Sequence, residues 1–322
     1  MADPAKKINS GESMTGFTDH HHQRLIALSQ ELGSIAHDKP LVSTVTIAAL
    51  LSSGHVLLED VPGIGKTTFV KALAKMLGLP MKRIQFTNDM LPGDILGTEL
   101  FDQKSQAFVF HKGPVFTNIV LADELNRASP RTQSALLEAM GEGVVTIGGK
   151  PEALPRPFMV FATQNPHEHL GTYPLPESQL DRFSAKLKLD YPSRMREQEV
   201  FRLSSLDPLA QIKSDVVTVA EMTEMREVLE SIHLSDRVVA YVKRFVDASR
   251  HNDKLELGVS TRGGVSWIRM ARARAMVEGR SYVIPDDLIA IAVPCLAHRV
   301  VTRNGSKSDP VILELTESVP LE

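Results

Sequence analysis

The sequence predicts a three-layer α/β domain with a mainly parallel central sheet, followed by a smaller α-helical domain. Two observations indicate this fold class. From residue 54 to about residue 190, short apolar runs of strand length alternate with segments of helical periodicity, which is typical of α/β proteins. After Tyr191 the chain keeps helical periodicity but has few strand signals, and residues 238–246 are one example. We therefore expect two folded units.

Composition narrows the class of protein further. The chain has 322 residues, of which 43% are apolar and 23% are charged, as in an ordinary globular protein. Its net charge of −3 provides no overall basic field for nucleic acid. The single cysteine, Cys295, lies in an apolar stretch, so we expect a buried thiol and a reducing compartment. With no signal-peptide pattern and no membrane segment of ~18 apolar residues, we expect a cytoplasmic protein, or one that is peripheral to a membrane through partners.

Along the chain we expect a disordered tail over residues 1–15, the α/β domain over 16–191, and the helical domain with a C-terminal tail over 192–322. Three adjacent histidines, His20–His22, cannot share one helix face, so a solvated helix start is a better interpretation than a metal site. Residues Val311–Leu315 predict a short final strand or an extended tail. No internal repeat is apparent.

The stretch GHVLLEDVPGIGKTTFVKALAKMLG (54–78) predicts a phosphate-binding loop. An apolar strand precedes the loop, and helical periodicity predicts a helix that opens at Lys66. Asp60 stands where the pattern G-x-x-x-x-G-K-[ST] has its first glycine. Aspartate tolerates the left-handed backbone region, and Gly63 and Gly65 remain to make the close approach. The alternative is a chance strand–turn–helix that contains Gly-Lys-Thr.

In such a loop, backbone N–H groups wrap the β-phosphate and the helix N-terminus adds partial positive charge. Lys66 is expected to reach the β- and γ-phosphates, and the Thr67 hydroxyl is expected to coordinate Mg²⁺. The residues expected to bind the nucleotide are Asp60, Pro62, Gly63, Ile64, Gly65, Lys66, Thr67 and Thr68.

A second site of polar residues follows another predicted strand. Ile119–Leu121 form an apolar strand core, and Asp123 and Glu124 stand where that strand ends. Phosphate-loop NTPases need carboxylates beside the loop, at the carboxyl ends of neighbouring strands. We expect Asp123 to bind Mg²⁺ through water together with Thr67. Glu124 is the expected general base, which polarises the water that attacks the γ-phosphate.

Three further side chains are candidates, each with an ordinary alternative. Asn165 ends a third predicted strand and either contacts the γ-phosphate or the attacking water, or simply forms a turn with the next proline. Arg182 is either a solvated residue or a finger aimed at a neighbouring subunit's γ-phosphate. Arg262 follows the candidate caps Ser260 and Thr261, so it falls in a helix's first turn, where a cation opposes the helix dipole. That mismatch indicates an anion such as phosphate, and a salt bridge to a lid carboxylate is the alternative.

The sequence resembles the MoxR family of AAA+ ATPases over nearly its whole length. Two blocks are more specific than the general nucleotide motifs, because they match QFT-x-D-x-LP-x-D-I-x-G and GTYPLPE-x-Q-LDRF. The stretches that carry the match are GHVLLEDVPGIGKT (54–67), QFTNDMLPGDILG (85–97), FHKGPVFTNIVLADELNRASPRTQSALLEAM (110–140), ATQNPHEHLGTYPLPESQLDRF (162–183), GVSTRGGVSWIRMARARAMVEGRSYVIPDDL (258–288) and LAHRV (296–300).

This resemblance implies an AAA+ domain with a helical lid that hydrolyses ATP to ADP with Mg²⁺. It leaves the roles of Asn126 and Arg127 open, and it leaves adenine contacts in doubt where IAHDKPLV (35–42) replaces a Val-Gly-Gln-like stretch. The roles that it implies are Walker A for Lys66 and Thr67, Walker B for Asp123 and Glu124, sensor 1 for Asn165, arginine finger for Arg182 and sensor 2 for Arg262.

Two insertions and an assembly are also implied by the resemblance. The patterns at 96–113 and 141–158 predict hairpins. The resemblance implies that they are the helix-2 insert and the pre-sensor-1 insertion of the family, and the alternative is that they are surface hairpins without a function. The family forms homo-oligomers, so we expect a ring, hexameric in the simplest case, with a von Willebrand factor A domain protein as partner. A lid arginine on the γ-phosphate and a finger supplied by the next subunit would make hydrolysis depend on neighbours.

We therefore expect a chaperone-like ATPase that remodels or assembles protein complexes. The first alternative is the ATPase subunit of a metal chelatase, which shares the helix-2 insert. A nucleic-acid motor or transcriptional activator is disfavoured by the mildly acidic balance and by the lack of an appended DNA-binding module. A nucleotide-dependent scaffold with negligible turnover is disfavoured because every expected catalytic residue is present.

Overall fold

At the centre of the protein lies a five-stranded sheet in the order β2-β5-β8-β1-β9, with every neighbouring pair parallel. The structure is a computed structural model that describes residues 17–36, 39–61, 63–165, 171–202, 207 and 209–321. The strands are β1 (Val56–Glu59), β2 (Met81–Gln85), β5 (Ile119–Asp123), β8 (Met159–Gln164) and β9 (Ala185–Leu187). The predicted parallel α/β class is therefore confirmed.

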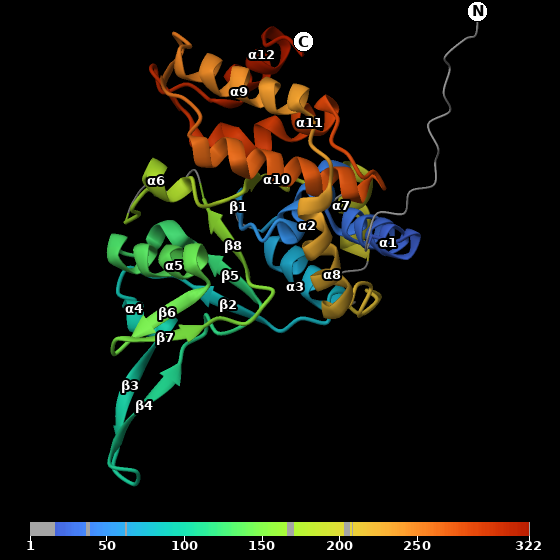
Figure 1. Cartoon of the computed structure of the whole chain (residues 1–322). Helices are drawn as coiled ribbons and strands as arrows, with labels where there is room; N and C mark the ends of the chain where they lie inside the picture. Colours follow the sequence, from blue (N-terminus) through green and yellow to red (C-terminus); the bar gives the residue numbers. More distant parts are fainter. Residues whose placement is uncertain are drawn as a thin grey trace, which may run out of the picture.

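Helices cover both faces of this sheet (Figure 1). Side chains alternate along each strand, so Leu58 and Leu121 pack into the core under α1, α2 and α3, whereas Leu57 and Val120 pack into the core under α5. The resulting three layers match the predicted arrangement. The helices of the two outer layers are α1 (Asp19–Ile35), α2 (Pro40–Leu51), α3 (Lys66–Met76), α4 (Pro92–Leu96), α5 (Pro130–Glu142) and α6 (Glu177–Leu180). A short 3₁₀ helix, η1 (Leu125–Arg127), precedes α5; further 3₁₀ helices are also labelled η.

Two antiparallel hairpins extend from the α/β layers. The first joins β3 (Gly97–Asp102) to β4 (Ala107–Lys112), and the second joins β6 (Val144–Ile147) to β7 (Lys150–Ala153). Figure 1 shows β3 and β4 projecting away from the rest of the protein, on the side opposite the C-terminal helices. The rings of Phe101 and Phe108 pack edge to face on this hairpin, with their centroids 5.4 Å apart, and both side chains remain largely exposed.

The C-terminal region is a helical lid, as the sequence predicts. Its core contains Tyr241, Phe245 and Trp267, and the Trp267 Nε1–H donates to the Leu288 carbonyl. The lid packs through α10 on α2 and through α11 on β9. Its elements, from the linker onward, are α7 (Arg194–Arg202), α8 (Val219–Val228), η2 (Leu229–Ser231), α9 (Asp236–Arg250), β10 (Leu255–Leu257), α10 (Thr261–Val277), α11 (Pro285–Leu296), η3 (Ala297–Arg299), β11 (Val301–Thr302) and α12 (Asp309–Ser318).

The prediction of a strand or tail at Val311–Leu315 is wrong, because these residues belong to α12. Pro310 stands in the first turn, where its fixed φ favours a helix and its missing N–H is not needed. Val311, Ile312 and Leu315 then fall on one helix face and are all buried. A run of five residues with four apolar side chains is therefore not sufficient to identify a strand.

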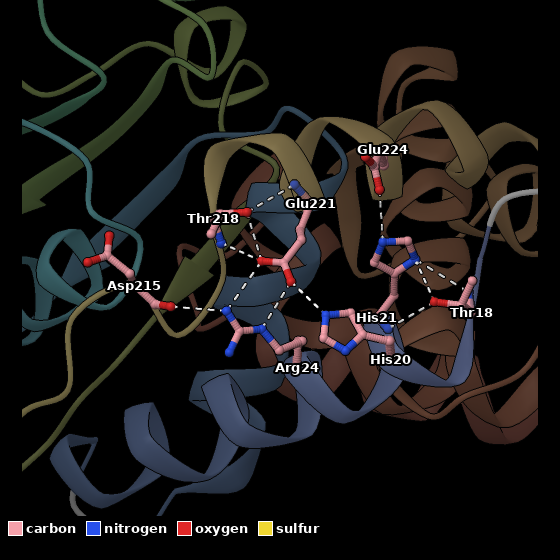
Figure 2. Close-up of polar contacts among 8 residues, drawn as sticks. All are labelled: Thr18, His20, His21, Arg24, Asp215, Thr218, Glu221 and Glu224. Atoms are coloured by element: carbon pink, nitrogen blue, oxygen red, sulfur yellow. Dashed lines mark hydrogen bonds and ion pairs between the residues drawn. The ribbon is translucent and has the colours of Figure 1, made fainter.

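The histidines at the start of α1 are only partly solvated, which corrects the sequence-based interpretation. His20 is exposed and contacts Glu221 at 2.9 Å, but His21 is buried and contacts Glu224 at 3.1 Å, and both glutamates lie on α8 (Figure 2). Arg24 adds a contact to Glu221 at 3.1 Å. Burial alone would raise the pKa of Glu221, but the hydrogen bonds that it accepts outweigh this effect and lower its pKa to about 2. These polar contacts join α1 to α8.

Expectations for residues 1–15 fall outside the described part of the chain. Within the described part, no helix combines the length and the apolar character that a membrane crossing requires. Cys295 is a buried free thiol, and burial raises its pKa to about 12. This agrees with the interpretation of Cys295 as a structural rather than a reactive residue.

Candidate active site

The phosphate-binding loop connects β1 to α3, which begins at Lys66 as predicted. Gly63 and Gly65 have φ angles of 85° and 90°, and a Cβ on either would meet no neighbouring atom within 4 Å. Both positions therefore need glycine for backbone conformation rather than for space. Pro62 lies outside the described residues. The Lys66 ammonium donates to the carbonyl oxygens of Asp60 (2.8 Å) and Val61 (3.3 Å), so it is held over the loop.

Asp60 replaces the usual glycine for a different reason from the one that its sequence suggested. It is absent from the described non-glycine residues with positive φ, so the left-handed interpretation is wrong. Instead its buried carboxylate accepts the backbone N–H groups of Leu189 (2.5 Å) and Asp190 (3.2 Å). Burial raises the pKa of Asp60, while these two N–H donors act in the opposite direction. Asp60 thus ties the start of the loop to the segment that leads from β9 to the lid.

The two carboxylates that follow β5 are fixed by a threonine of the next strand. The Thr163 hydroxyl donates to Asp123 Oδ1 (2.6 Å) and accepts the Glu124 backbone N–H (2.8 Å). Arg83 on β2 pairs with the other Asp123 oxygen at 2.6 Å. Glu124 itself has φ 57° and ψ 47°, a left-handed conformation that costs energy in a non-glycine residue. Glu124 thus follows the end of β5 and directly precedes the short helix η1.

Glu124 already has two donors on one oxygen. Gln85 Nε2 donates to Glu124 Oε2 at 2.8 Å, and Arg127 Nη1 donates to the same atom at 2.9 Å. Sequence reasoning left the role of Arg127 open and did not single out Gln85. The signal for Gln85 was its place at the carboxyl end of β2, the edge where Asp123 also stands.

Lys66 and the two carboxylates face one another across this edge. Burial lowers the pKa of Lys66, whereas the negative charges of Asp60, Asp123 and Glu124 raise it. The structure therefore brings the loop lysine and both predicted acidic residues into one electrostatic unit. Asn165 follows the end of β8, and the carbonyl of Gln164 accepts the Asp60 N–H, so Asn165 belongs to the same edge.

The donor set at this edge fits Mg²⁺. Thr67 lies in the first turn of α3 and Asp123 at the end of β5, and both offer hard oxygen atoms. Among the described residues, no group of three or more His, Cys, Asp or Glu side chains could hold a metal ion alone. Mg²⁺ commonly binds through one or two protein oxygens together with substrate phosphates. Thr67 and Asp123 are thus suited to hold an ion that a triphosphate brings with it.

Arg182 and Arg262 are expected catalytic residues. The phosphate loop and the two carboxylates lie where the parallel strands end (the carboxyl edge), but the structure places both arginines where the strands begin (the amino edge). The Ser184 N–H donates to the carbonyl of His55 (2.9 Å), immediately before β1. Because a strand rises about 3.3 Å per residue, the five residues from His55 to Asp60 put the phosphate loop roughly 16 Å away along the sheet.

The surroundings of Arg182 keep it on its own side of the molecule. Its Nη1 donates to the Leu137 carbonyl of α5 at 2.7 Å. A Cβ at Gly141 would lie 2.5 Å from the same nitrogen, so the guanidinium group packs directly over that glycine. Arg182 is half-buried in this position. In this position the guanidinium group lies at the amino edge of the sheet, away from the phosphate loop of its own chain.

Arg262 stands in the first turn of α10 with Ser260 as the helix cap, as predicted; the Ser260 hydroxyl accepts the Gly263 N–H at 2.9 Å. Its side chain is exposed, and it forms no salt bridge with a carboxylate of the described lid residues, which disfavours that alternative. The contact of Ser260 with Asp181 places the start of α10, and with it Arg262, at the same amino edge as Arg182.

A cavity of about 450 Å³ lies between the start of α2, the end of β9 and the lid helices α11 and α12. Lys39 on its wall pairs with Asp190 at 2.5 Å, and the Asp190 N–H donates to Asp60. Leu41 and other apolar side chains form the floor. Residues 39–42, part of the segment whose adenine contacts are in doubt, thus line this cavity, and Lys39 is linked to the phosphate loop through Asp190 and Asp60. Positions 37 and 38 lie outside the described residues.

A glycine loop before α3, carboxylates at the end of a neighbouring parallel strand and a helical lid together define a P-loop ATPase of the AAA+ class. Comparisons agree with this definition. The family described as "ATPase family associated with various cellular activities (AAA)" matches residues 55–185, and the AAA lid domain family matches residues 247–317.

Similar proteins narrow the class to one family. Chaperone MoxR1 of Mycobacterium tuberculosis is 41% identical over 84% of this chain and 73% of its own length. YeaC of Bacillus subtilis is also 41% identical, over 92% of this chain and 95% of its length. A crystal structure of a candidate ATPase from Cytophaga hutchinsonii has a TM-score of 0.85 and 35% identity, covering 94% of this chain and 96% of that one. The chain belongs to the MoxR family of AAA+ ATPases, and its activity is ATP hydrolysis.

Proposed function

We propose that this ATPase works as a homo-oligomeric ring, hexameric in its simplest form, which couples ATP hydrolysis to remodelling or assembly of protein complexes. In this ring one subunit holds the triphosphate, and the next subunit supplies Arg182 and Arg262. The observation that carries the proposal is the separation of the site into two edges. A strand's length lies between the phosphate loop and the Ser184–His55 contact, so one chain cannot complete its own site.

Each proposed role follows from the position of the residue. Lys66 binds the β- and γ-phosphates, and the N–H groups after Gly65 add the positive end of α3. Glu124 accepts a proton from the attacking water, and Asn165 orients that water. Mg²⁺ held by Thr67 and Asp123 would neutralise phosphate charge.

The arginines of the next subunit then stabilise charge that develops as the γ-phosphate leaves. Loss of that phosphate removes the anion that the two subunits share, and the interface relaxes. This relaxation is the step that can perform mechanical work on a bound protein. ATP binding by one subunit is thus coupled to the position of its neighbour's lid.

For the partner we propose a von Willebrand factor A domain protein, in accord with the family resemblance. The exposed aromatic residues Phe101 and Phe108 on the projecting hairpin offer one surface suited to a protein partner. A cytoplasmic location is part of the proposal, and the reduced, buried thiol of Cys295 is compatible with it.

The proposal is tested with the Glu124→Gln variant, which should bind ATP without hydrolysing it. Sedimentation of this variant with ATP should give a ring, and the ring should bind a purified von Willebrand factor A domain protein from the same genome. Lys66→Ala is the matched control, because it removes the phosphate contact and should remain unassembled under the same conditions. A Glu124→Gln sample that stays monomeric with ATP would contradict the ring, and one that assembles but binds no such partner would contradict the partner.

A further inference from the structure

Arg299 occupies a buried position between the lid and the segment that carries Arg182. Only 2% of its side chain is exposed. All five of its N–H donors are used: Nε donates to Cys295 O, Nη1 donates to the carbonyl and the carboxylate of Asp181, and Nη2 donates to Phe183 O and Ser266 Oγ. One guanidinium group therefore joins α11, α10 and residues 181–183.

Asp181 makes the reciprocal set of contacts. Its carboxylate accepts from Arg299 at 2.5 Å and from the Ser260 hydroxyl at 3.2 Å on each oxygen. The same Ser260 hydroxyl accepts the Gly263 N–H and so caps α10. Burial lowers the pKa of Arg299, and the Asp181 charge opposes this shift, as expected for a paired buried ion.

These contacts connect the segments that carry Arg182 and Arg262. Arg182 is the next residue after Asp181, and Arg262 is the second residue after Ser260. His298 adds a further link, since its Nε2 lies 2.9 Å from the Phe183 carbonyl. A displacement of α10 must therefore move the Arg182 segment with it, unless buried hydrogen bonds break.

We propose that Asp181 and Arg299 are positioning residues that fix the end of α6 to the first turn of α10, so that Arg182 and Arg262 reach one triphosphate as a unit. This inference rests on the proposed function, in which that triphosphate belongs to the neighbouring subunit. The Asp181–Arg299–Ser260 clamp then converts the position of the lid into the position of the finger. Neither clamp residue touches the nucleotide.

Mixed rings test the clamp, with separate donor and acceptor chains. Donor chains carry Glu124→Gln, so they cannot hydrolyse ATP but offer both arginines. Acceptor chains carry Arg182→Ala and keep their own phosphate loop and base. Turnover in the mixture then reports only how well a donor completes an acceptor's site.

Ser260→Asp and Ser260→Thr in the donor are a matched pair. Both residues cap a helix, so both donors should keep α10 folded, with similar melting temperatures. Threonine retains the hydroxyl donor to Asp181, whereas aspartate removes it and places a like charge beside Asp181. We expect the Ser260→Asp donor to lower kcat at the acceptor site about tenfold relative to Ser260→Thr, with the KM for ATP unchanged, because small misplacements of catalytic groups are costly.

Three outcomes decide between the claims. If the unmodified donor restores turnover but the Ser260→Asp and Ser260→Thr donors are equally effective, the clamp is wrong and the ring proposal stands. If the unmodified donor restores no turnover, the ring proposal and the clamp are both wrong. Should Ser260→Asp not fold, Asp181→Asn in the donor replaces it, since it keeps the shape of the side chain and removes its charge; an unchanged kcat with that donor would also overturn the clamp.

Discussion

At the carboxyl edge of the sheet the polar groups come from short, continuous stretches, whereas at the amino edge they are single residues from segments far apart along the chain. Lys66 and Thr67 are consecutive, and so are Asp123 and Glu124. The clamp instead joins Asp181 to Arg299 across 118 positions. The carboxyl edge is also half-exposed, whereas Arg299 at the centre of the clamp is buried.

This difference separates binding from coupling. Groups that take up a ligand must remain accessible, so their charges are partly solvated and their hydrogen bonds can be exchanged for phosphate oxygens. Groups that transmit a movement must not yield, and buried, fully paired hydrogen bonds are suited to that task because breaking one leaves an unpaired polar group. Variants at the two edges should consequently have different effects on ATP affinity, turnover and stability.

The largest effect is expected for Arg182→Ala. Removal of a finger at the amino edge should lower kcat by about 10³ or more while leaving the Kd for ATP nearly unchanged, because the arginine acts on a neighbour's transition state. Steady-state kinetics and equilibrium ATP binding on the same sample give the two values. A loss of ATP affinity as large as the loss of kcat would place Arg182 in its own subunit's site and remove the distinction between the edges.

Acid should weaken the amino edge through His55. Burial lowers the pKa of this imidazole from 6.5 to about 4, although its hydrogen bond to the Met140 carbonyl opposes the shift. The folded state therefore binds this proton less well than the unfolded state does, and the stability contribution present above pH 6.5 is lost as the pH falls towards 4. The difference corresponds to about 3 kcal/mol.

Thermal unfolding at pH values from 7.5 to 4.5 measures this dependence, with His55→Gln as the comparison. Glutamine cannot titrate in this range, so the wild-type chain should lose stability with a steeper slope below pH 6.5. Parallel slopes for the two proteins would show that His55 does not carry the pH dependence.

A smaller effect is expected at Asp60, where the carboxyl edge meets the lid linker. Asp60→Gly restores the consensus loop but leaves the buried Leu189 N–H without its acceptor, which should cost about 1–3 kcal/mol of unfolding free energy. Asp60→Asn keeps one acceptor oxygen and should cost less. Denaturant unfolding ranks the two variants, and a Gly variant as stable as the wild type would mean that the loop-to-linker contact contributes nothing.

The smallest effect should come from Gln85→Ala. Its amide holds Glu124 Oε2 together with Arg127, and one hydrogen bond is worth about 1 kcal/mol. Releasing the carboxylate should raise basal turnover about fivefold without altering ATP affinity. Gln85→Glu is an informative companion, because it replaces the donor by a like charge. A fall in basal turnover with Gln85→Ala would instead mean that Gln85 positions the base for attack.

Much of the carboxyl edge could be predicted from the sequence, because a strand–loop–helix pattern constrains neighbouring residues directly. The parallel sheet, the start of α3 at Lys66 and the lid class are confirmed. The left-handed interpretation of Asp60 is wrong, because its carboxylate instead accepts hydrogen bonds from the backbone N–H groups of residues 189 and 190, far along the chain. Local patterns contain no information about such a partner.

The amino edge was less accessible to prediction. Arg182 and Arg262 could be identified by resemblance, but their position relative to the phosphate loop depends on how α10 packs against α2 and residues 181–183, which periodicity does not specify. Asp181 and Arg299 stood inside matching stretches without any assigned role. The prediction of a strand at Val311–Leu315 is wrong for a simpler reason, because strand and helix patterns overlap in short apolar runs.

The central claim is that each nucleotide site is completed by the neighbouring subunit's amino edge. Mixing Arg182→Ala chains with Glu124→Gln chains, each nearly inactive alone, tests it directly through the ATPase rate as a function of mixing ratio. We expect a maximum at intermediate ratios that clearly exceeds the rate of either variant, because some interfaces then combine an intact base with an intact finger. A rate that varies linearly between the two pure variants would contradict it.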